Sequence, residues 1–175
     1  MVLDVGCGTV KRETGPECIG IDACVRSAAD VIWDLDEFPW PLESNTFDRI
    51  YMSHIIEHLS DVLGAMHEIH RVARNDADVF IVTPHFSSHN SYTDPTHVRH
   101  LAARSFEYFT NIDFATFTGS SLTFSIESLN LTFGSNILLD TVARWLVRRN
   151  MTWYEHRAAW MFPAQDIHCH LKAHK

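Results

Sequence analysis

The sequence predicts a single α/β domain built around a mostly parallel β-sheet. Short apolar runs such as "VLDV" at residues 2–5 end at a glycine or an acidic residue, as buried parallel strands often do. Helical periodicity occupies two longer segments between such runs, at 59–74 and 137–149. The chain has 175 residues and shows no internal repeat or linker, so one domain with a substantial core accounts for all of it.

The first half of the chain predicts five strands and one amphipathic helix. The strands are expected at 2–5, 18–22, 30–33, 47–53 and 78–83. The helix at 59–74 has Ser60 in the N-cap position and Asn75 as its stop. Its apolar residues recur three and four positions apart and therefore share one face. They are Val62, Leu63, Met66, Ile69, Val72 and Ala73.

The second half begins with a polar, irregular segment at 84–103, and a connection of this length is expected to serve function. A short helix near 105–110 and one long strand or a hairpin at 122–133 are expected to follow. The helix at 137–149 is expected to turn four residues inward, namely Leu138, Val142, Trp145 and Leu146. An alternating strand at 166–174 closes the chain.

The composition argues against several classes of partner. Apolar residues make up 46% of the chain and charged residues 21%, as in a soluble globular protein. The net charge of −8 repels phosphate backbones, so nucleic acid is not expected as a partner. No apolar run is long enough for an integral membrane segment, and the first ten residues lack a signal peptide's basic region. Because the four cysteines suggest no disulfide framework, we expect a reduced, cytoplasmic protein.

Acidic residues and glycines accompany the first three predicted strands. Asp4 lies within the first strand, Asp22 ends the second, and Asp34 follows the third. Gly6 and Gly8 come directly after the first strand, where the lack of a side chain lets a ligand approach the backbone. Ligands of parallel α/β sheets bind beyond the carboxyl ends of the strands, so these residues predict a ligand site there.

A dinucleotide is the first ligand class to weigh at this edge of the sheet. Its site requires a third glycine, a helix N-terminus under the pyrophosphate and an acid about 20 residues further on. Here Lys11 occupies the third glycine position, and Gly15 and Pro16 leave little room for a full helix. Asp22 also follows Gly8 by only 14 residues. A phosphate site at a helix N-terminus is therefore poorly supported.

A nucleoside without phosphate fits the same residues better. Asp22 is placed to accept hydrogen bonds from both ribose hydroxyls, and an acid near the glycines suits a cationic amino group. Asp34 is placed to accept a hydrogen bond from an adenine amino group, while Leu35 packs on the ring. S-adenosylmethionine combines these three features and carries no phosphate.

Four stretches of the sequence form an ordered series. In chain order they are "VLDVGCGT", "GIDA", "ADVIWDLDEFPWPLESNTFDRIYMSHIIEHL" and "RVARNDADVFIVTPH". They resemble the successive motifs of class I S-adenosylmethionine-dependent methyltransferases, and they are most similar to the type 11 branch. The resemblance runs from about Val2 to Phe109 and is weaker beyond. The first motif alone is moderately specific, whereas four motifs in order at the right intervals are strongly so.

This resemblance implies a binding site for S-adenosyl-L-methionine and for its product, S-adenosyl-L-homocysteine. The residues so implied are Asp4, Gly6 and Gly8 at the methionine end, Asp22 at the ribose, Asp34 and Leu35 at the adenine, and Ser53 and His54 near the transferred methyl group.

The resemblance also implies a Rossmann-like, seven-stranded, mostly parallel sheet with helices on both faces and the last strand antiparallel. The first strand begins at Val2 and little helix follows the glycines, so we expect a fold shortened at the N-terminus. One methyltransferase domain is expected over 1–175, with a cofactor-binding half at 1–83 and an acceptor-shaping half at 84–175. Another subunit could help to cover the cofactor, which leaves a homodimer open.

Residues 54–58, "HIIEH", match the inverted zinc-protease signature H-x-x-E-H. On a helix, His54 and His58 would share one face and bind zinc, with Glu57 as the base. The same residues fall inside the methyltransferase motifs, where that family often has a Glu-His pair. A zinc metallohydrolase is therefore kept as the alternative, and the methyltransferase is favoured.

Histidines are densest in "PHFSSHNSYTDPTHVRH", residues 84–100. In one interpretation His85 is a general base that takes a proton from an acceptor hydroxyl, with His54 as the second candidate. In another the segment is a hydrogen-bonded polar loop that shapes the acceptor pocket. The third and less favoured interpretation is a divalent metal with four candidate ligands, namely His85, His89, Asp94 and His97.

No motif identifies the acceptor. Type 11 likenesses recur among enzymes of sugar, lipid and secondary metabolism, so a small hydroxylated acceptor and O-methylation are expected. The stretch 143–162 interleaves arginines with aromatic residues. For that stretch, an amphipathic helix packed on the sheet is favoured over binding to a membrane surface or an acidic ligand. A protein that binds S-adenosylmethionine without catalysis is kept as a second alternative.

Overall fold

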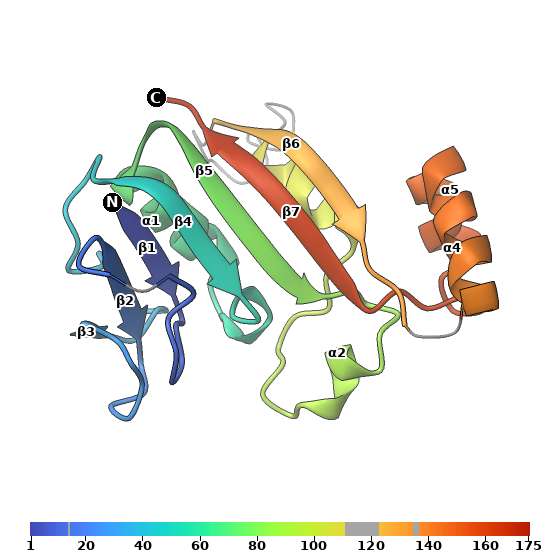
Figure 1. Ribbon diagram of the computed structural model, residues 1–175, viewed down its shortest axis with the longest axis horizontal. Helices are drawn as coiled ribbons and strands as arrows, with labels where there is room; N and C mark the ends of the chain where they lie inside the picture. The colour runs from blue at the N-terminus through green and yellow to red at the C-terminus, as the bar shows by residue number, and fades with distance from the viewer. Residues whose placement is uncertain (14, 111–122, 135–136) are drawn as a thin grey trace.

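The computed structural model describes residues 1–13, 15–110, 123–134 and 137–175. These residues form a seven-stranded sheet with helices at one face and at one end (Figure 1). The strands are β1 (Val2–Val5), β2 (Cys18–Asp22), β3 (Val31–Ile32), β4 (Phe47–Ser53), β5 (Ala73–Pro84), β6 (Phe124–Leu131) and β7 (Asp166–Ala173). The helices are α1 (Val62–Val72), α2 (Asn90–Thr93), α4 (Ile137–Arg149) and α5 (Met151–Arg157), with 3₁₀ helices η1 (Ile56–His58) and η2 (Ala103–Phe109).

The strand order across the sheet is β3-β2-β1-β4-β5-β7-β6. Each neighbouring pair from β3 to β5 is parallel, whereas β7 runs antiparallel to both β5 and β6. The predicted Rossmann-like sheet of seven mostly parallel strands, with an antiparallel last strand, is therefore confirmed. The chain moves outward from β1 to β3 and then returns to the other side of β1, so the order reverses between β1 and β4. Open α/β sheets bind their ligands at such a reversal.

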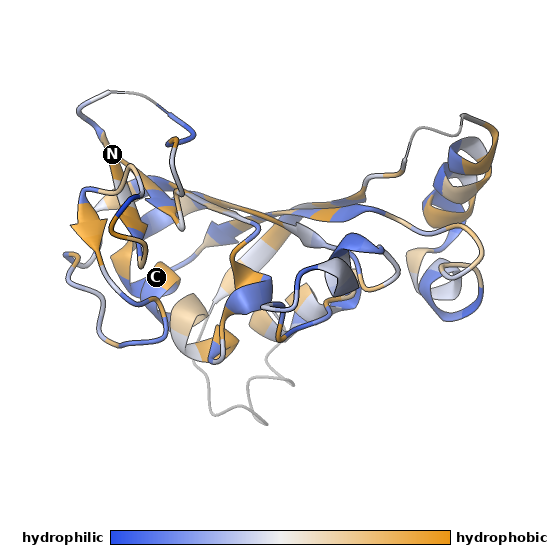
Figure 2. Cartoon of the chain, turned by 90° about the horizontal axis from the view of Figure 1, so that it is seen from below, coloured by the Kyte–Doolittle hydropathy of each residue, from blue (hydrophilic) through white to orange (hydrophobic). Residues whose placement is uncertain are grey.

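The hydrophobic core lies between the sheet and the helices on one of its faces. Figure 2 shows α1 and η2 on the same side of the sheet. Successive side chains of a strand point to opposite faces, so alternate residues of β4 and β5 reach this core. The main contributors are Leu3, Val5, Ile50, Met52, Val79 and Ile81 from the strands, and Met66, Ile69, Val72 and Phe106 from the helices.

The opposite face of the sheet carries an aromatic stack. The rings of Tyr51 and Phe80 lie 5.3 Å apart, and the rings of Phe80 and His170 lie 4.3 Å apart. In the described ranges no helix lies over these central strands (Figure 2). The expected helical cover on both faces is therefore met on one face within those ranges. The physical reason is the short connection from β1 to β2, in which residues 6–13 and 15–17 form no helix.

Helix α1 is shorter than the periodicity of the sequence suggests. It begins at Val62, because the side chain of Asp61 caps it by accepting a hydrogen bond from the backbone N–H of Gly64 at 2.8 Å. The predicted cap, Ser60, instead donates its backbone N–H to Asp36 at 3.0 Å. The helix ends at Val72 and strand β5 starts at the next residue, ahead of the predicted stop at Asn75.

Helices α4 and α5 lie beyond the ends of β6 and β7 (Figure 1). Three of the four residues predicted to turn inward from α4 are exposed: Leu138 is 80% exposed, Val142 42% and Trp145 56%. The fourth, Leu146, is partly buried and packs against the core as predicted. Ala143 is its buried position, and Arg149 lies over the Trp145 ring at 5.2 Å. The favoured packing of this helix on the sheet is therefore wrong. Among the described residues, no helix combines the length and the apolar character that crossing a bilayer requires.

Candidate functional site

Gly6 begins the loop that leaves β1 at the reversal of strand order. It has φ +66°, a left-handed conformation that favours glycine. A Cβ atom built on Gly6 would lie 2.0 Å from Cγ1 of Ile55, so this position has no room for any side chain. The loop therefore passes directly against the segment that follows β4. Gly8 also has a positive φ, of +56°, but a Cβ atom there would meet nothing within 4 Å.

Asp22, at the end of β2, holds this loop in place. Its Oδ2 accepts a hydrogen bond from the backbone N–H of Gly8 at 2.8 Å, and its Oδ1 accepts one from Cys24 at 2.7 Å. A carboxylate oxygen has two lone pairs, so each oxygen retains capacity for a ribose hydroxyl. Asp22 thus orders the glycine loop and presents acceptors to a ligand beside it.

Asp34 and Leu35 follow β3 and stand on the same cavity as Gly6 and Asp22. The cavity has a volume of about 200 Å³. Its walls are Gly6, Asp22, Ala23, Asp34, Leu35, Asp36, Ile55, His58 and Leu59. Four residues that the sequence assigned to the cofactor are therefore brought together around one space. It offers carboxylates at one side and the buried side chain of Leu35 for a flat apolar ring.

The segment that carries Leu35 is fixed by a buried network behind it. The indole Nε1 of Trp40 donates a hydrogen bond to the backbone carbonyl of Leu35 at 3.2 Å. Glu68 of α1 accepts from the backbone N–H of Trp40 at 2.7 Å, and Arg71 binds both oxygens of Glu68 at 2.8 and 2.7 Å. Burial opposes ionisation of Glu68, but these hydrogen bonds outweigh it and lower its pKa. The side of the cavity that Leu35 forms is therefore held by α1.

Asp4 and Ser53, expected at the methionine end and near the methyl group, are both in contact with Arg12. Asp4 is buried, and its Oδ2 accepts from the backbone N–H of Arg12 at 2.7 Å. Burial raises the pKa of Asp4, against the lowering effect of this hydrogen bond. The guanidinium of Arg12 donates to Oγ of Ser53. Ser53 and Arg12 line a separate hollow of about 180 Å³ on the sheet face that carries Tyr51 and Phe80.

His54 follows β4 in a left-handed conformation, with φ +55°. Its side chain is 50% exposed, and its Nδ1 lies 3.4 Å from Oε1 of Glu57. The carboxylate of Glu57 raises the pKa of His54. The 3₁₀ helix η1 starts only at Ile56, so His54 and His58 do not share one face of an α-helix. The arrangement that the zinc-protease signature needs is therefore not formed.

His85, the first candidate for the general base, is fully buried, with 0% of its side chain exposed. Its Nδ1 accepts from the backbone N–H of Ser87 at 3.2 Å, which leaves Nε2 as the donor to Oε1 of Glu155 at 3.2 Å. The same oxygen accepts from the backbone N–H of Ala103 at 2.7 Å. The structure does not support His85 as the base, because both ring nitrogens already form hydrogen bonds within the protein. The ring is also buried, so a methyl-accepting substrate cannot reach it. His85 instead connects the end of β5 to α5 and η2.

The other predicted metal ligands do not form the expected set. His89 is exposed and stands on a different cavity, and Asp94 is exposed and accepts hydrogen bonds from Thr96. Within the described ranges, only His97 of the four enters a cluster of metal-binding side chains, and its neighbours there are Glu57 and His58. The loop thus contributes one histidine to the segment that follows β4.

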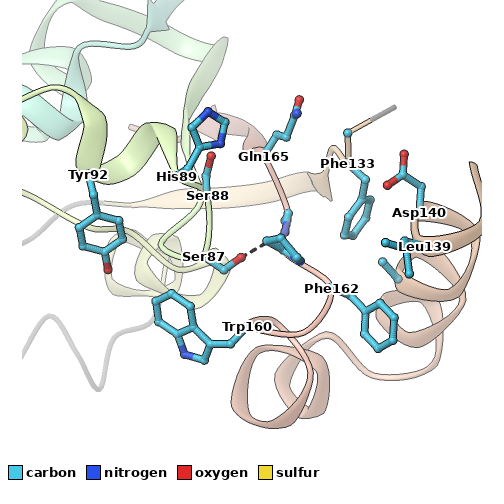
Figure 3. A pocket seen from close by; sticks show the side chains of 14 residues that line it. Ser87, Ser88, His89, Tyr92, Phe133, Leu139, Asp140, Trp160, Phe162 and Gln165 are labelled. Carbon is cyan, nitrogen blue, oxygen red and sulfur yellow. Dashed lines mark hydrogen bonds between the residues drawn. The ribbon is translucent and has the colours of Figure 1, made fainter. Parts of the chain in front are cut away.

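A second, larger cavity of about 500 Å³ opens beside the segment that follows β5 (Figure 3). Aromatic side chains from the loop, from the end of β6 and from the segment after α5 face it, whereas Ser88, His89 and Gln165 supply polar groups. The aromatic residues are Tyr92, Phe133, Trp160 and Phe162. Such a lining suits a small organic molecule with apolar surface and a few polar groups.

Several of these residues could not be assigned from the sequence. Arg12 is one of two adjacent basic residues in a loop, and no pattern marks it as the contact of Asp4 and Ser53. Glu155 is an acid within a basic, aromatic stretch, and this contrast was the available signal. Trp160 lies in the same stretch, and no further signal in the sequence marks it.

The comparisons with known proteins agree with this geometry. The family model described as "Methyltransferase domain" matches residues 1–171. No curated protein sequence matches the chain.

Solved structures share the fold at low sequence identity. The YcgJ protein from Bacillus subtilis has a TM-score of 0.62 at 18% identity, over 99% of this chain and 92% of that one. A SAM-dependent methyltransferase from Archaeoglobus fulgidus has a TM-score of 0.61 at 21% identity, over 98% and 85%. An S-adenosylmethionine-dependent methyltransferase from Mesorhizobium loti has a TM-score of 0.61 at 14% identity, over 98% and 89%.

Proposed function

This chain belongs to the methyltransferase domain family and is an S-adenosylmethionine-dependent methyltransferase of class I; from that premise we propose that it methylates an oxygen atom of a small hydroxylated acceptor. Sugars, lipids and secondary metabolites are the acceptor classes that we consider. The branch of the family, type 11 in our prediction, stays a prediction. A zinc metallohydrolase is not favoured, because His54 and His58 do not present a helical zinc pair.

The cavity that joins Gly6, Asp22, Asp34 and Leu35 is the observation that supports the donor site best. Acidic side chains and the apolar side chain of Leu35 line this cavity, at the edge of the sheet where the strand order reverses. Such a lining suits an adenosine group without phosphate. We propose that Asp22 accepts from the ribose hydroxyls and Asp34 from the adenine amino group. Leu35 would then pack on the ring, held there by Trp40.

For the methionine end we propose Asp4, Gly8 and Ser53, with Arg12 as an added member. Arg12 contacts Asp4 through its backbone and Ser53 through its guanidinium. A guanidinium binds carboxylates through paired donors, so Arg12 suits the carboxylate of the donor's amino acid part. Asp4 suits the amino group. Burial raises the pKa of Asp4, and a neighbouring ammonium group would oppose this effect by favouring the charged carboxylate.

The cavity of about 500 Å³ beside the segment that follows β5 is the proposed acceptor site. All its lining residues lie between Ser87 and Gln165, whereas the donor cavity is lined by residues from Gly6 to Leu59. This separation supports a cofactor-binding half at 1–83 and an acceptor-shaping half at 84–175. Aromatic walls with a serine, a histidine and an amide fit a compact molecule that has hydroxyls on an apolar frame. A cytoplasmic location and a homodimer stay predictions.

When bound, S-adenosylmethionine supplies a methyl carbon activated by a sulfonium charge. The chain must then aim the acceptor oxygen at that carbon and remove the hydroxyl proton. Of the two predicted bases, His54 has the exposed side chain, at the carboxyl end of β4 beside the donor loop. We therefore propose that His54 takes the proton from the acceptor hydroxyl. We propose that His85 holds the segment after β5 in place through its contact with Glu155.

The test is acceptor-dependent turnover. Purified protein would be incubated with S-adenosylmethionine and panels of sugars, phenols and hydroxylated lipids, and the release of S-adenosylhomocysteine would be measured. We expect release that depends on one hydroxylated class, with the methyl group on oxygen by mass spectrometry and NMR. Methylation on nitrogen would contradict the acceptor chemistry. Donor binding with no turnover on any acceptor would favour the non-catalytic alternative.

A further inference from the structure

The carboxylate of Glu57 is buried with one oxygen satisfied and the other not. The side chain is 2% exposed. Its Oε2 accepts a hydrogen bond from Oγ1 of Thr83 at 3.0 Å. Its Oε1 has no hydrogen-bond partner among the described residues. A buried carboxylate oxygen without a donor is costly, so its surroundings should explain how the charge is stabilised.

His97 turns its Nε2 atom toward this oxygen. Its Nδ1 is 3.2 Å from the backbone carbonyl of Ser91, and a carbonyl can only accept, so Nδ1 carries the proton. In the neutral ring Nε2 is then a lone-pair acceptor, and it lies 3.9 Å from Oε1 of Glu57. Two acceptors face each other at a distance too long for a hydrogen bond. The side chain of His97 is itself 8% exposed.

His58 is fixed in the same tautomer by its neighbours. The hydroxyl of Thr96 donates its proton to Oδ1 of Asp94 at 2.6 Å, because a carboxylate is an acceptor. The same hydroxyl oxygen is then free to accept from Nδ1 of His58 at 3.0 Å. Nε2 of His58 is therefore unprotonated in the neutral ring. Its ring also meets the ring of His97 edge-on, with centroids 4.6 Å apart.

When both imidazoles are neutral, these three side chains bring lone pairs close together. One ligand atom from each of Glu57, His58 and His97 lies within 4.8 Å of the other two. Two atoms that bind one zinc ion lie about 3.4 Å apart at a tetrahedral angle and at most about 4.2 Å apart. The 3.9 Å between Glu57 and His97 falls inside that range, and the 4.8 Å limit that includes His58 exceeds it by about 0.6 Å.

We propose that Glu57, His58 and His97 form a binding site for a divalent transition metal ion. Two imidazoles and one carboxylate are a recurrent ligand set for zinc and for iron(II), and three protein ligands leave a coordination position open. The hydrogen bonds from Nδ1 of each imidazole are the kind of outer contact that orients metal ligands. A cation at this point also gives Oε1 a partner in direct contact, in addition to Nδ1 of His54 at 3.4 Å.

The metal ion would connect two segments that shape the active site. The backbone N–H groups of Val98 and Arg99 already donate to the carbonyl of Glu57, at 3.0 and 3.1 Å. His58 lines the donor cavity. An ion held by His58 and His97 would therefore lock the histidine segment against η1 beside the donor. His54 is not needed as a ligand, although its Nδ1 lies 3.4 Å from the same oxygen.

This site differs from both metal arrangements that the sequence suggested. The zinc-protease interpretation made Glu57 a base and paired His54 with His58, whereas here Glu57 is a ligand. The loop interpretation used four residues of 84–100, of which only His97 takes part. The ligands come from two segments some 40 residues apart in the chain, and the fold brings them together.

Calorimetric titration of untagged, chelator-treated protein with zinc chloride at neutral pH tests the proposal. We expect one equivalent to bind at micromolar or tighter affinity to the wild type. His97→Ala and Glu57→Gln should each weaken this binding by tenfold or more, as expected when a ligand is lost. Cobalt(II) in place of zinc should give visible absorption bands that both variants lose. None of these readouts depends on methyl transfer.

His100→Ala is the matched control, because His100 lies in the same segment but bonds to Oγ of Ser91 and stacks on Tyr92. It should bind zinc as the wild type does. Glu57→Gln can keep the contact with Thr83, and circular dichroism would confirm that each variant is folded. Equal zinc affinity in the wild type and in folded Glu57→Gln would overturn the site. Absence of tight zinc binding to the wild type would do so as well, whatever the result for the donor.

Discussion

The carboxylate of Asp22 accepts a hydrogen bond from the backbone N–H of Gly8 at 2.8 Å, so the acid that ends β2 fixes the loop that leaves β1. The second oxygen of Asp22 accepts from Cys24 in the same way. A ligand at this edge therefore meets a loop and a carboxylate whose positions depend on each other. This coupling makes Asp22 the residue of the proposed donor site that orders the glycine loop directly.

Replacing Asp22 by alanine should weaken S-adenosylhomocysteine binding by about 1–3 kcal/mol, or roughly 5- to 150-fold. The change removes the proposed ribose acceptor and leaves the N–H of Gly8 without its partner. Calorimetry on both proteins measures the difference. Glu43→Ala, at an exposed acid in the turn before β4, is the control and should bind as the wild type does. Unchanged affinity in Asp22→Ala would remove Asp22 from the site.

The two glycines of the loop provide a matched pair of substitutions. Gly8→Ala should cost about 1 kcal/mol of stability, because alanine is strained at φ +56° but meets no neighbour. Gly6→Ala has the same strain and adds a clash with Ile55, so we expect about 1–3 kcal/mol more. Urea unfolding of both variants measures the costs. Equal costs would show that Ile55 moves aside freely.

The pair of Glu68 and Arg71 should stabilise the fold in a pH-dependent way. The pKa of Glu68 is lowered in the folded protein, so its contribution is complete above the unfolded value, about 4.3. It is lost as the pH falls through the lower folded value. Glu68→Gln should therefore cost about 1–3 kcal/mol at pH 7 and progressively less below about pH 4. Chemical unfolding of both proteins from pH 3 to 7 tests this prediction. A difference in unfolding free energy that grows as the pH falls would contradict a lowered pKa of Glu68 in the folded protein.

The same variant should also affect the donor site through Trp40. Glu68 anchors the backbone of Trp40, and Trp40 holds the carbonyl of Leu35. A looser Leu35 should weaken S-adenosylhomocysteine binding while the fold persists at neutral pH. Glu43→Gln, with no role in that network, should change neither stability nor affinity.

Replacing each of the two candidate histidines by alanine should affect a different property, namely turnover for His54 and stability for His85. His54→Ala should keep the fold and donor binding but lower turnover by roughly 100-fold, since its exposed side chain is the proposed base. His85→Ala should lower stability by about 2–3 kcal/mol, because it leaves Glu155 buried without its donor from the ring. Thermal unfolding and turnover, measured on both variants, separate the roles. Full turnover in His54→Ala would exclude it as the base.

The strands could be predicted because each is a short apolar run bounded by glycine, proline or acidic residues. The ends of α1 could not, because Asp36 binds the backbone N–H groups of Ser60 and Asp61 and displaces the cap by one residue. The predicted inward face of α4 also differs from the structure, because Leu138, Val142 and Trp145 are exposed and Leu146 alone of the four packs against the core. Helical periodicity identifies an apolar face but not what covers it, and here α4 lies beyond the sheet (Figure 1).

That Gly6, Asp22, Asp34 and Leu35 line one cavity could be predicted, because they follow local motifs at strand ends. The role of His85 depends on Glu155, which is 70 residues away, so no local pattern could show that its ring is buried and engaged. The cluster of Glu57, His58 and His97 could not be predicted for the same reason, since its residues come from two distant segments that only the fold brings together. Sequence patterns thus predicted which strand ends meet around the cavity, whereas the contacts of the histidines depend on the folded structure.

The most direct test of the account is calorimetric titration of untagged, metal-free wild-type protein with S-adenosylhomocysteine. We predict binding of one equivalent at micromolar affinity, which would establish the donor cavity beside Gly6 and Asp22. Absence of binding would contradict the central claim that this chain, as it stands, holds the methyl donor.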